Sequence, residues 1–285
     1  MTQAYITDKK LDEFIRLSLA EDIGDGDHTT LAVVPPEKEN KAKLLVKGHG
    51  VIAGVELARL IWEKIDPTLN WEVFFKDGDK VDIGDVVFEV SGKARTILTG
   101  ERLVLNCLQR MSGIATKTRT ITELLNNTQA KILDTRKTTP NFRMMEKWAV
   151  FIGNGNNHRF GLYDMILLKD NHIDVAGGIQ KAIAFTRKYL QKTEKNLKIE
   201  IETRNLTEVQ EVLNTGGVDI IMLDNMTPSM MKEAIELING KYIVEASGNI
   251  TENNILEVAR TGVDFISMGA LTHSYQSLDL SLKIV

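Results

Sequence analysis

Basic residues gather in three places between positions 131 and 173, and each group follows an apolar run. The groups are Arg136 with Lys137, His158 with Arg159, and Lys169. An apolar run that ends in a polar loop is typical of a buried strand, and α/β folds bind ligands at the carboxyl ends of strands. Arg grips a carboxylate or phosphate through two hydrogen bonds, and Lys adds a compact charge. A single group of this kind could equally belong to a solvated loop. Three such groups together predict a site for a ligand with several anionic groups.

Acidic and small residues stand at the ends of four later apolar runs. Glu202, Asp224, Ser247 and Gly269 occupy these positions, at intervals of 22, 23 and 22 residues. Carboxylates that face cations suit a substrate with fixed negative charges and a magnesium-bound phosphate or ribose hydroxyls. The small residues around the last two positions would let backbone N–H groups approach a phosphate.

Intervals of 22 or 23 residues are the length of a tight βα unit, which forces parallel strands with right-handed crossovers. Thr207, Thr227 and Thr251 stand near the expected N-caps of the helices between the runs. About seven strands would form an open (β/α) barrel, whose strand ends carry the active site. The expected strands lie at 197–203, 218–225, 241–248 and 263–270, with further runs near 132, 150 and 166.

The first part of the chain has a different pattern. Apolar residues recur at helical spacing over 8–20, and the acidic stretch 21–30 favours a structural turn over a metal site, because its carboxylates do not match a calcium loop. Short β-prone runs cut by glycine fill 41–92, with a helix expected at 58–65. The alternating piece 76–90 resembles the hairpins of carrier domains, but has no lysine placed to carry biotin or lipoate. Together these runs predict an N-terminal α+β domain.

The longest helical pattern covers 99–127, with a break or bend expected at Gly113. Arg102 would lie in its first turn, where a cation opposes the positive end of the helix dipole. A surface arginine and a functional arginine are equally compatible with that position.

Composition narrows the function classes. The chain has 285 residues, 43% of them hydrophobic and 26% charged, which is enough for one large core or two modest ones. A net charge of -4 argues against a nucleic-acid or membrane-surface binder. The single cysteine, Cys107, excludes an internal disulfide and a Cys-rich zinc site. Since no signal-peptide or membrane-spanning pattern is visible, we expect a cytoplasmic protein.

Eight longer motifs occur along the chain. They are EDIGDGDHT, TGERLVLNCLQRMSGIAT, DTRKTTP, NHRFGLYDMILLKDNHI, IEIET, MLDN, EASGNI and ISMGALTHS. Together they resemble the quinolinate phosphoribosyltransferase family, in the family's order and over essentially the whole chain.

The resemblance implies a glycosyltransferase of NAD synthesis. Such an enzyme converts quinolinate and phosphoribosyl pyrophosphate, with magnesium, into nicotinate mononucleotide, pyrophosphate and carbon dioxide. The resemblance also implies an N-terminal α+β open sandwich domain, expected at 1–115, and an open α/β barrel at 116–270, with the tail 271–285 returning to the first domain. A homodimer, or a higher oligomer, would let the partner's N-terminal half close each active site.

The resemblance assigns the basic residues to quinolinate. Lys137 corresponds to a lysine beside the reacting centre, and Thr135 to a hydroxyl or backbone contact. Arg102 corresponds to an arginine that reaches into the partner's site. The cations that hold the two quinolinate carboxylates correspond to Arg136, His158, Arg159 and Lys169.

The acidic and small residues correspond to the other substrate. Glu202 and Asp224 match the acids that engage the ribose hydroxyls and magnesium, directly or indirectly. The phosphate-binding loops correspond to Ser247, Gly248, Asn249 and Gly269.

Three asparagines depart from the family pattern, which has glycine at these places. They are Asn141, Asn154 and Asn249. Asparagine tolerates left-handed backbone angles better than other side chains, so we expect the turns to survive.

Three other functions stay open at this point. A Schiff-base aldolase or lyase could use Lys137 or Lys169 at a barrel rim, although such a lysine needs few neighbouring cations. A relative of the same fold linked to molybdenum uptake is a nearer alternative. The third is a metabolite-binding protein that kept the barrel without catalysis, and the presence of both Glu202 and Asp224 counts against it.

Overall fold

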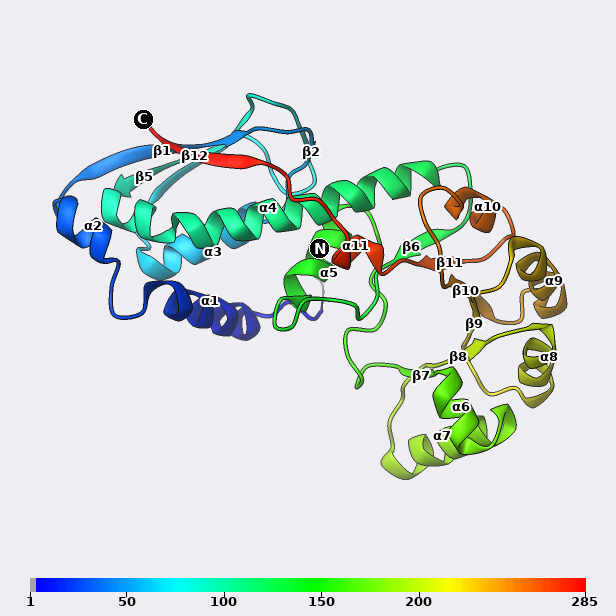
Figure 1. Ribbon diagram of the computed structural model, residues 1–285. Coiled ribbons are helices and arrows are strands. Elements are labelled where there is room, and N and C mark those ends of the chain that lie inside the picture. The colour runs from blue at the N-terminus through cyan, green and yellow to red at the C-terminus, as the bar shows by residue number, and fades with distance from the viewer. Residues whose placement is uncertain (1–3) are drawn as a thin grey trace. The chain divides into compact units, whose positions relative to one another are not determined.

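The computed structural model describes residues 4–285, which fall into two compact units (Figure 1). The first unit comprises the chain up to Thr120 together with 138–154 and 271–285, and the second comprises 121–137 and 155–270. The expected boundary after 115 lies inside helix α4 (Ala94–Leu124), which continues through it without interruption. The segment 138–154, expected in the barrel, groups with the first unit instead.

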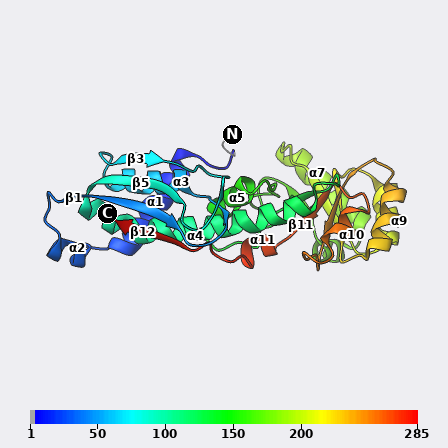
Figure 2. The same cartoon turned by 90° about the horizontal axis from the view of Figure 1, so that it is seen from above.

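The first unit is built on a four-stranded antiparallel sheet. Trp62, Trp71 and Phe88 pack ring against ring in its core, with centroids 5.1 to 6.1 Å apart. Figures 1 and 2 show helices α3 (Val55–Ile65) and α4 along one face of this sheet. The strands, in spatial order, are β12 (Leu280–Ile284), β1 (Glu39–Val46), β5 (Val86–Lys93) and β3 (Asn70–Val73).

Smaller elements complete the first unit, and two of them bear on expectations from the sequence. Asp27 caps α2 by accepting a hydrogen bond from the N–H of Thr30, so the acidic stretch 21–30 links two helices, in keeping with a structural role. The expected hairpin at 76–90 is wrong, because β4 pairs with β2, and β5 pairs with β1 and β3. The smaller elements of the first unit are α1 (Asp8–Ile23), α2 (His28–Val33), β2 (Gly50–Val51), β4 (Lys80–Val81), α5 (Arg143–Ile152) and α11 (Ala270–His273).

Helix α4 begins at Ala94, five residues before the expected start. Arg102 therefore lies inside the helix, and the argument from an unfavourable first-turn position was wrong. The helix also passes through Gly113 without a break. A Cβ at Gly113 would lie 2.2 Å from the carbonyl oxygen of Gln276, so the glycine allows the returning chain to approach the helix closely.

The second unit is an open barrel of parallel strands. Figures 1 and 2 show helices α8, α9 and α10 along the outer side of the strands. In spatial order the strands are β6 (Lys131–Leu133), β11 (Phe265–Ser267), β10 (Ile243–Ser247), β9 (Ile220–Asp224), β8 (Ile199–Thr203) and β7 (Ile166–Leu168). The helices are α6 (Asp170–Ala176), α7 (Ile179–Thr193), α8 (Leu206–Thr215), α9 (Pro228–Ile238) and α10 (Ile255–Ala259).

The structure has six strands in this sheet rather than the seven expected, within residues 4–285. The run near 150 belongs to helix α5, in which Met145, Ala149 and Val150 are buried at helical spacing. A short apolar run of this kind does not distinguish a strand from one buried helix face. Strands β6 and β7 stand at the two edges of the sheet, so the barrel stays open.

The N-caps are partly as expected. Thr227 caps α9 by accepting a hydrogen bond from the N–H of Met230, as predicted. Asn205, rather than Thr207, caps α8, and Asn254, rather than Thr251, occupies the N-cap of α10. Within residues 4–285, no helix combines the length and apolar character that crossing a bilayer requires.

Candidate active site

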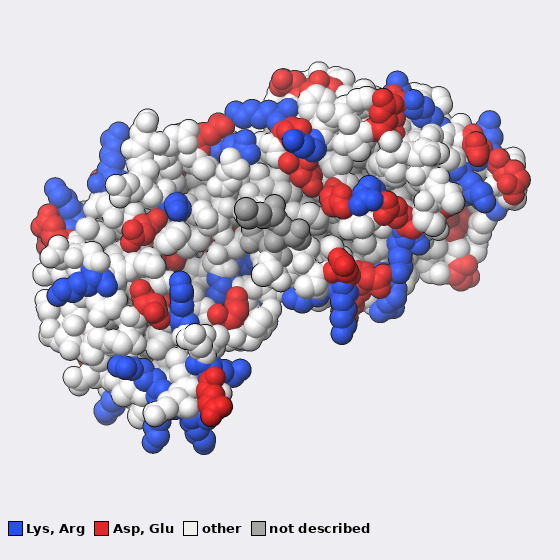
Figure 3. All heavy atoms as spheres, turned by 180° about the vertical axis from the view of Figure 1, so that it is seen from behind, with Lys and Arg blue, Asp and Glu red and all other residues white. Residues whose placement is uncertain are grey.

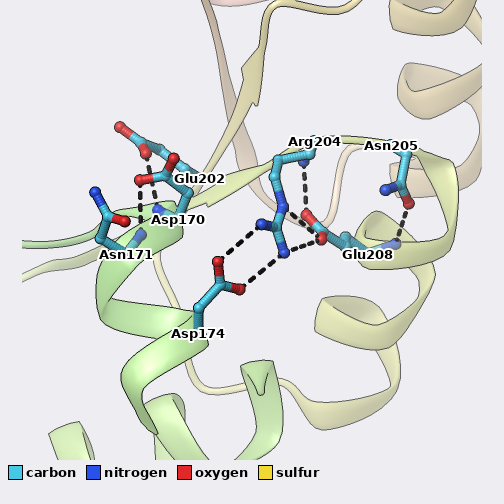
Figure 4. Close-up of polar contacts among 7 residues, drawn as sticks. All are labelled: Asp170, Asn171, Asp174, Glu202, Arg204, Asn205 and Glu208. Carbon is cyan, nitrogen blue, oxygen red and sulfur yellow. Dashed lines mark hydrogen bonds and ion pairs between the residues drawn. The ribbon is translucent and has the colours of Figure 1, made fainter. Parts of the chain in front are cut away.

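The loop after β7 and the end of strand β8 bring a lysine and an acid together. The carboxylate of Glu202 lies 3.5 Å from Lys169 Nζ. It also accepts a hydrogen bond of 3.2 Å from the N–H of Asp170 (Figure 4). Lys169 is exposed, and Glu202 is almost fully buried in strand β8. Parallel pairing of β7 with β8 places both residues at the same end of the sheet.

Asp224 ends the neighbouring strand β9 and joins this group. Burial raises the pKa of its carboxyl, and the negative charge of Asp170 raises it further, while a hydrogen bond from Asn225 lowers it. The positive charges of Lys169 and Lys137 also lower this pKa, so both lysines lie close to Asp224. The acids and the lysines predicted at different strand ends therefore share one site.

Arg159 and Arg136 lie near each other beside these acids. Burial lowers the pKa of Arg159, and the charge of Arg136 lowers it again, whereas Glu200, Asp164 and Glu202 raise it. The Nη1 of Arg159 donates a hydrogen bond of 3.1 Å to the carbonyl of Met165. Two guanidinium groups this close together would suit an anion with more than one negative group.

The His158 ring is held by protein groups at both nitrogens. Its Nε2 lies 2.8 Å from Glu200 Oε2 and 3.5 Å from Glu245 Oε2. Its Nδ1 accepts a hydrogen bond of 2.8 Å from the N–H of Arg159. The backbone N–H of His158 in turn donates to Asp134 Oδ1 at 2.9 Å, so the ring and its backbone are both fixed.

Glu200 and Glu245 are functional candidates that sequence reasoning missed. They are 0% and 1% exposed, and burial raises the pKa of Glu200 to about 7 and that of Glu245 to about 8. The sequence did contain an indication, since Glu200 is two residues before Glu202 and Glu245 two residues before Ser247. Residues two apart on a strand share a face, so each shares a face with a predicted site residue.

His158, Glu200 and Glu245 also have ligand atoms within 4.8 Å of one another, an arrangement that could hold a metal ion. The N–H of Arg159 points at Nδ1, so Nδ1 carries a lone pair and the ring proton is on Nε2. That proton is directed at Glu200. The contacts therefore favour a hydrogen-bonded cluster over a metal site.

The predicted phosphate loop after β10 is built on left-handed residues. Gly248 has a φ of 87°, and a Cβ there would lie 2.2 Å from Asn225 Oδ1, so a side chain is excluded. Asn249 follows with a φ of 53° and donates a hydrogen bond of 2.9 Å to the same oxygen. The N–H of Asn225 donates to the carbonyl of Ser247 at 2.9 Å, which ties the ends of β9 and β10 together.

The three asparagines that replace glycine in the family pattern all adopt left-handed angles. Asn141, Asn154 and Asn249 have φ values of 62°, 69° and 53°. The expectation that asparagine preserves these turns is therefore confirmed.

The remaining predicted residues are placed as follows. Arg102 is exposed on α4 in the first unit, and makes no hydrogen bond or ion pair with any part of the chain that the structure describes. Thr135 accepts a hydrogen bond of 3.0 Å from the N–H of Lys137, which closes the turn after β6. Gly269 lies two residues after the end of β11.

Arg204 lies beyond Glu202, at the end of β8, and secures the neighbouring helices. It donates to both oxygens of Asp174 at 3.1 Å and to Glu208 at 2.8 Å (Figure 4). Asp174 belongs to α6 and Glu208 to α8. The loop that carries Lys169 therefore leads into a helix that is bound to the next βα unit.

Charge is otherwise dispersed. On the face drawn in Figure 3, basic and acidic side chains are interleaved, and neither sign forms a continuous patch. This distribution agrees with the small net charge of -4. The positive charge at the strand ends is therefore local, as expected for a small anionic substrate.

The family model for the C-terminal domain of quinolinate phosphoribosyl transferase matches residues 114–283, and the model for its N-terminal domain matches residues 27–112. Together the two models account for most of the chain, and they support the quinolinate enzymes over the lyase and molybdenum-uptake alternatives.

Individual relatives are similar to this chain over nearly its whole length. Quinolinate phosphoribosyltransferase (decarboxylating) 1b of Nicotiana tabacum is 46% identical, over 95% of this chain and 81% of its own. Nicotinate-nucleotide pyrophosphorylase (carboxylating), chloroplastic, of Arabidopsis thaliana is 47% identical over the same shares. The crystal structure of NadC from Streptococcus pyogenes superposes with a TM-score of 0.93 at 40% identity, and the match covers 99% of each chain.

Proposed function

Because this chain belongs to the quinolinate phosphoribosyltransferase family, we propose that the barrel end where the basic and acidic residues meet is its active site. The chain transfers the phosphoribosyl group of phosphoribosyl pyrophosphate to quinolinate with loss of carbon dioxide, which yields nicotinate mononucleotide for NAD synthesis. The observation that supports the site most strongly is the meeting of Lys137, Lys169, Glu202 and Asp224 at one end of the sheet.

Quinolinate binds at the basic side of this site. Arg136 and Arg159 lie close together and half-buried, which suits the two adjacent carboxylates of the pyridine ring. Lys169 adds a third charge, and His158 borders the arginines. Arg102 of the partner subunit completes the site in a homodimer, a role supported by its exposure and by its lack of a partner within residues 4–285.

Phosphoribosyl pyrophosphate binds at the acidic side. Glu202 and Asp224 supply carboxylate oxygens, the ligands that magnesium prefers, so they would hold the ribose hydroxyls and a magnesium ion directly or through water. Magnesium would offset the negative charge of the pyrophosphate. The loop Ser247–Gly248–Asn249 offers backbone groups for the phosphate, and Gly269 lies at the end of the next strand.

The residues act by positioning and charge. As pyrophosphate leaves, positive charge spreads over ribose C1 and the ring oxygen, where Glu202 and Asp224 stabilise it while the pyridine nitrogen attacks. Lys137 and Lys169 lie where they can neutralise departing anionic oxygens. Once the nitrogen is alkylated, its positive charge stabilises the carbanion that remains after carbon dioxide departs. The arginines must grip the carboxylate that stays more firmly than the one that leaves.

Calorimetric titration tests this proposal directly. We expect quinolinate to bind the protein, phosphoribosyl pyrophosphate to bind more tightly with magnesium than with a chelator, and carbon dioxide to be released only when both substrates are present. Binding of quinolinate without any carbon dioxide release would indicate a metabolite-binding protein. Trapping of a keto substrate by borohydride would instead indicate a Schiff-base enzyme.

Two further features stay predictions. The homodimer rests on the position of Arg102 and on the family resemblance. A cytoplasmic location rests on the sequence pattern, whereas the Arabidopsis relative is named as chloroplastic.

A further inference from the structure

Two buried carboxyl groups in the barrel have no role in the proposed chemistry. Glu200 lies on β8 and Glu245 on β10, with β9 between these strands. Their side chains nevertheless interact, so both lie on the same face of the sheet. Burying two carboxyl groups in a protein interior costs free energy unless they form hydrogen bonds or ion pairs. One oxygen of each, Oε1, has no hydrogen-bond partner within residues 4–285.

The other oxygen of each carboxyl contacts the His158 ring. Glu200 Oε2 is 2.8 Å from Nε2, and Glu245 Oε2 is 3.5 Å from the same nitrogen. Residues from β8 and β10 therefore converge on one imidazole, and Ser267 of β11 interacts with Glu245 behind it. The His158 side chain is only 8% exposed, and its contacts leave one orientation for the ring.

The fixed ring in turn holds the backbone of Arg159. The lone pair on Nδ1 accepts the N–H of Arg159 at 2.8 Å, and the carboxylate of Asp134 holds the preceding N–H of His158. The backbone from which Arg159 projects is therefore bonded to the buried carboxyl pair through the ring. A guanidinium that must meet a rigid dicarboxylate loses less entropy on binding if its backbone is already fixed.

We propose that Glu200 and Glu245 are positioning residues for quinolinate: they hold the His158 ring by Nε2, and the ring holds the backbone of Arg159 at the substrate. This inference rests on the proposed function only in taking Arg159 as a quinolinate ligand. Neither carboxyl touches a reacting atom. Their effect is on quinolinate affinity and not on the phosphoribosyl side of the site.

The test compares Glu245→Leu with Glu245→Gln, because glutamine keeps a polar side chain beside Nε2 and Glu200, and leucine does not. For the leucine variant we expect quinolinate Kd and KM to rise about tenfold, the effect of removing one buried hydrogen-bonding group from the cluster. The Kd for phosphoribosyl pyrophosphate and kcat should stay within about twofold, which is little more than measurement error on this scale. The glutamine variant should recover most of the quinolinate affinity. Thr203→Val, which removes a buried hydrogen bond on the opposite face of β8, is the matched control and should leave quinolinate affinity unchanged.

A double-mutant cycle shows whether the effect passes through the ring. In a His158→Ala background, Glu245→Leu should not weaken quinolinate binding further. An equal loss in both backgrounds, or wild-type quinolinate affinity in Glu245→Leu, would overturn the inference. If the wild-type protein bound no quinolinate at all, the proposed function itself would fail, and that result is distinct from either of these.

A spectroscopic measurement keeps the inference testable even if the leucine variant does not fold. In protein labelled with ¹⁵N-histidine, the resonances lost in His158→Ala should be those of a neutral ring with its proton on Nε2. A proton on Nδ1 would contradict the relay to Arg159. Stoichiometric divalent metal that is lost in Glu245→Gln would also contradict it, because Nε2 would then be a metal ligand.

Discussion

At the scale of single residues, the site depends on charges that are partly removed from water. The pKa of Arg159 is lowered by burial and by the charge of Arg136, so the two guanidinium groups repel each other. An anion with two carboxylates relieves this repulsion. On the proposed function, we expect selectivity for a dicarboxylate to follow from these two half-buried cations.

Arg159→Ala should therefore weaken quinolinate binding by roughly 1.5 to 3 kcal/mol, the range for a charge-assisted hydrogen bond. This corresponds to an increase in Kd of about 10- to 150-fold. Isothermal titration measures it, with Arg260→Ala as a control, because Arg260 is an exposed arginine at the end of α10. Wild-type affinity in Arg159→Ala would remove Arg159 from the quinolinate site.

Burial of Glu245 has a consequence for stability. Its pKa is raised by burial from 4.5 to about 8, so the folded state keeps a proton that the unfolded state releases. The stability that this proton contributes is complete below about pH 4.5 and declines as the pH rises towards 8. Glu245→Gln has no such proton to lose. From pH 5.5 to pH 8, its free energy of unfolding should therefore increase relative to that of wild type, by an amount on the order of 2 kcal/mol. Urea denaturation of both proteins at the two pH values measures the difference, and a difference that did not change with pH would refute the raised pKa.

At the scale of elements, each βα unit of the barrel positions one polar residue at the end of its strand. Strand β8 is fully buried over its length, and Arg204 beyond it joins α6 to α8. The N-caps then determine where each following helix begins. The cap of α9 is the simplest to test, because Thr227 both accepts the N–H of Met230 and precedes a proline at the first helical position.

Thr227→Ala should lower the free energy of unfolding by about 1 kcal/mol, the usual value of an N-cap. Thr207→Ala is the matched control: Thr207 was expected near a cap, but it lies exposed inside α8, behind the true cap Asn205. The control should change stability by less than about 0.5 kcal/mol. Chemical denaturation distinguishes the two variants, and equal effects would contradict the observed cap.

At the scale of the whole molecule, the proposal that Arg102 completes the partner's site predicts a dimer. Arg102 lies on α4 of the first unit, whereas Lys169 lies on the second. If Arg102 acts in the partner's site, a mixture of Arg102→Ala and Lys169→Ala subunits forms hybrid dimers with one complete site. With random exchange about a quarter of wild-type activity should return, since half the dimers are hybrids and half of their sites are complete.

The same mixing of Arg159→Ala with Lys169→Ala subunits is the control. Both of these residues belong to one site on one chain, so every hybrid site lacks one of them and activity should stay low. Absence of recovery with Arg102→Ala, despite subunit exchange shown by differently tagged chains, would place Arg102 in the site of its own subunit.

The sequence by itself determined the barrel strands and the strand-end residues. Burial repeats along a strand or helix with a fixed period, so the runs around 199–203, 220–224 and 243–247 and their terminal polar residues were readable from local pattern. The left-handed asparagines were also foreseeable, because backbone preference is a property of the single residue. The run near 150 and the piece 76–90 were misread, since both are short and fit more than one period.

Only the tertiary structure decided what the polar residues do together. His158 and Glu200 are 42 residues apart, and no local pattern indicates that they meet. Their contact depends on strand order and register, which place β10, β9 and β8 side by side so that Glu245 and Glu200 reach one imidazole. Periodicity shows which face a side chain is on, but the partner across the barrel is set by packing between segments far apart in the chain.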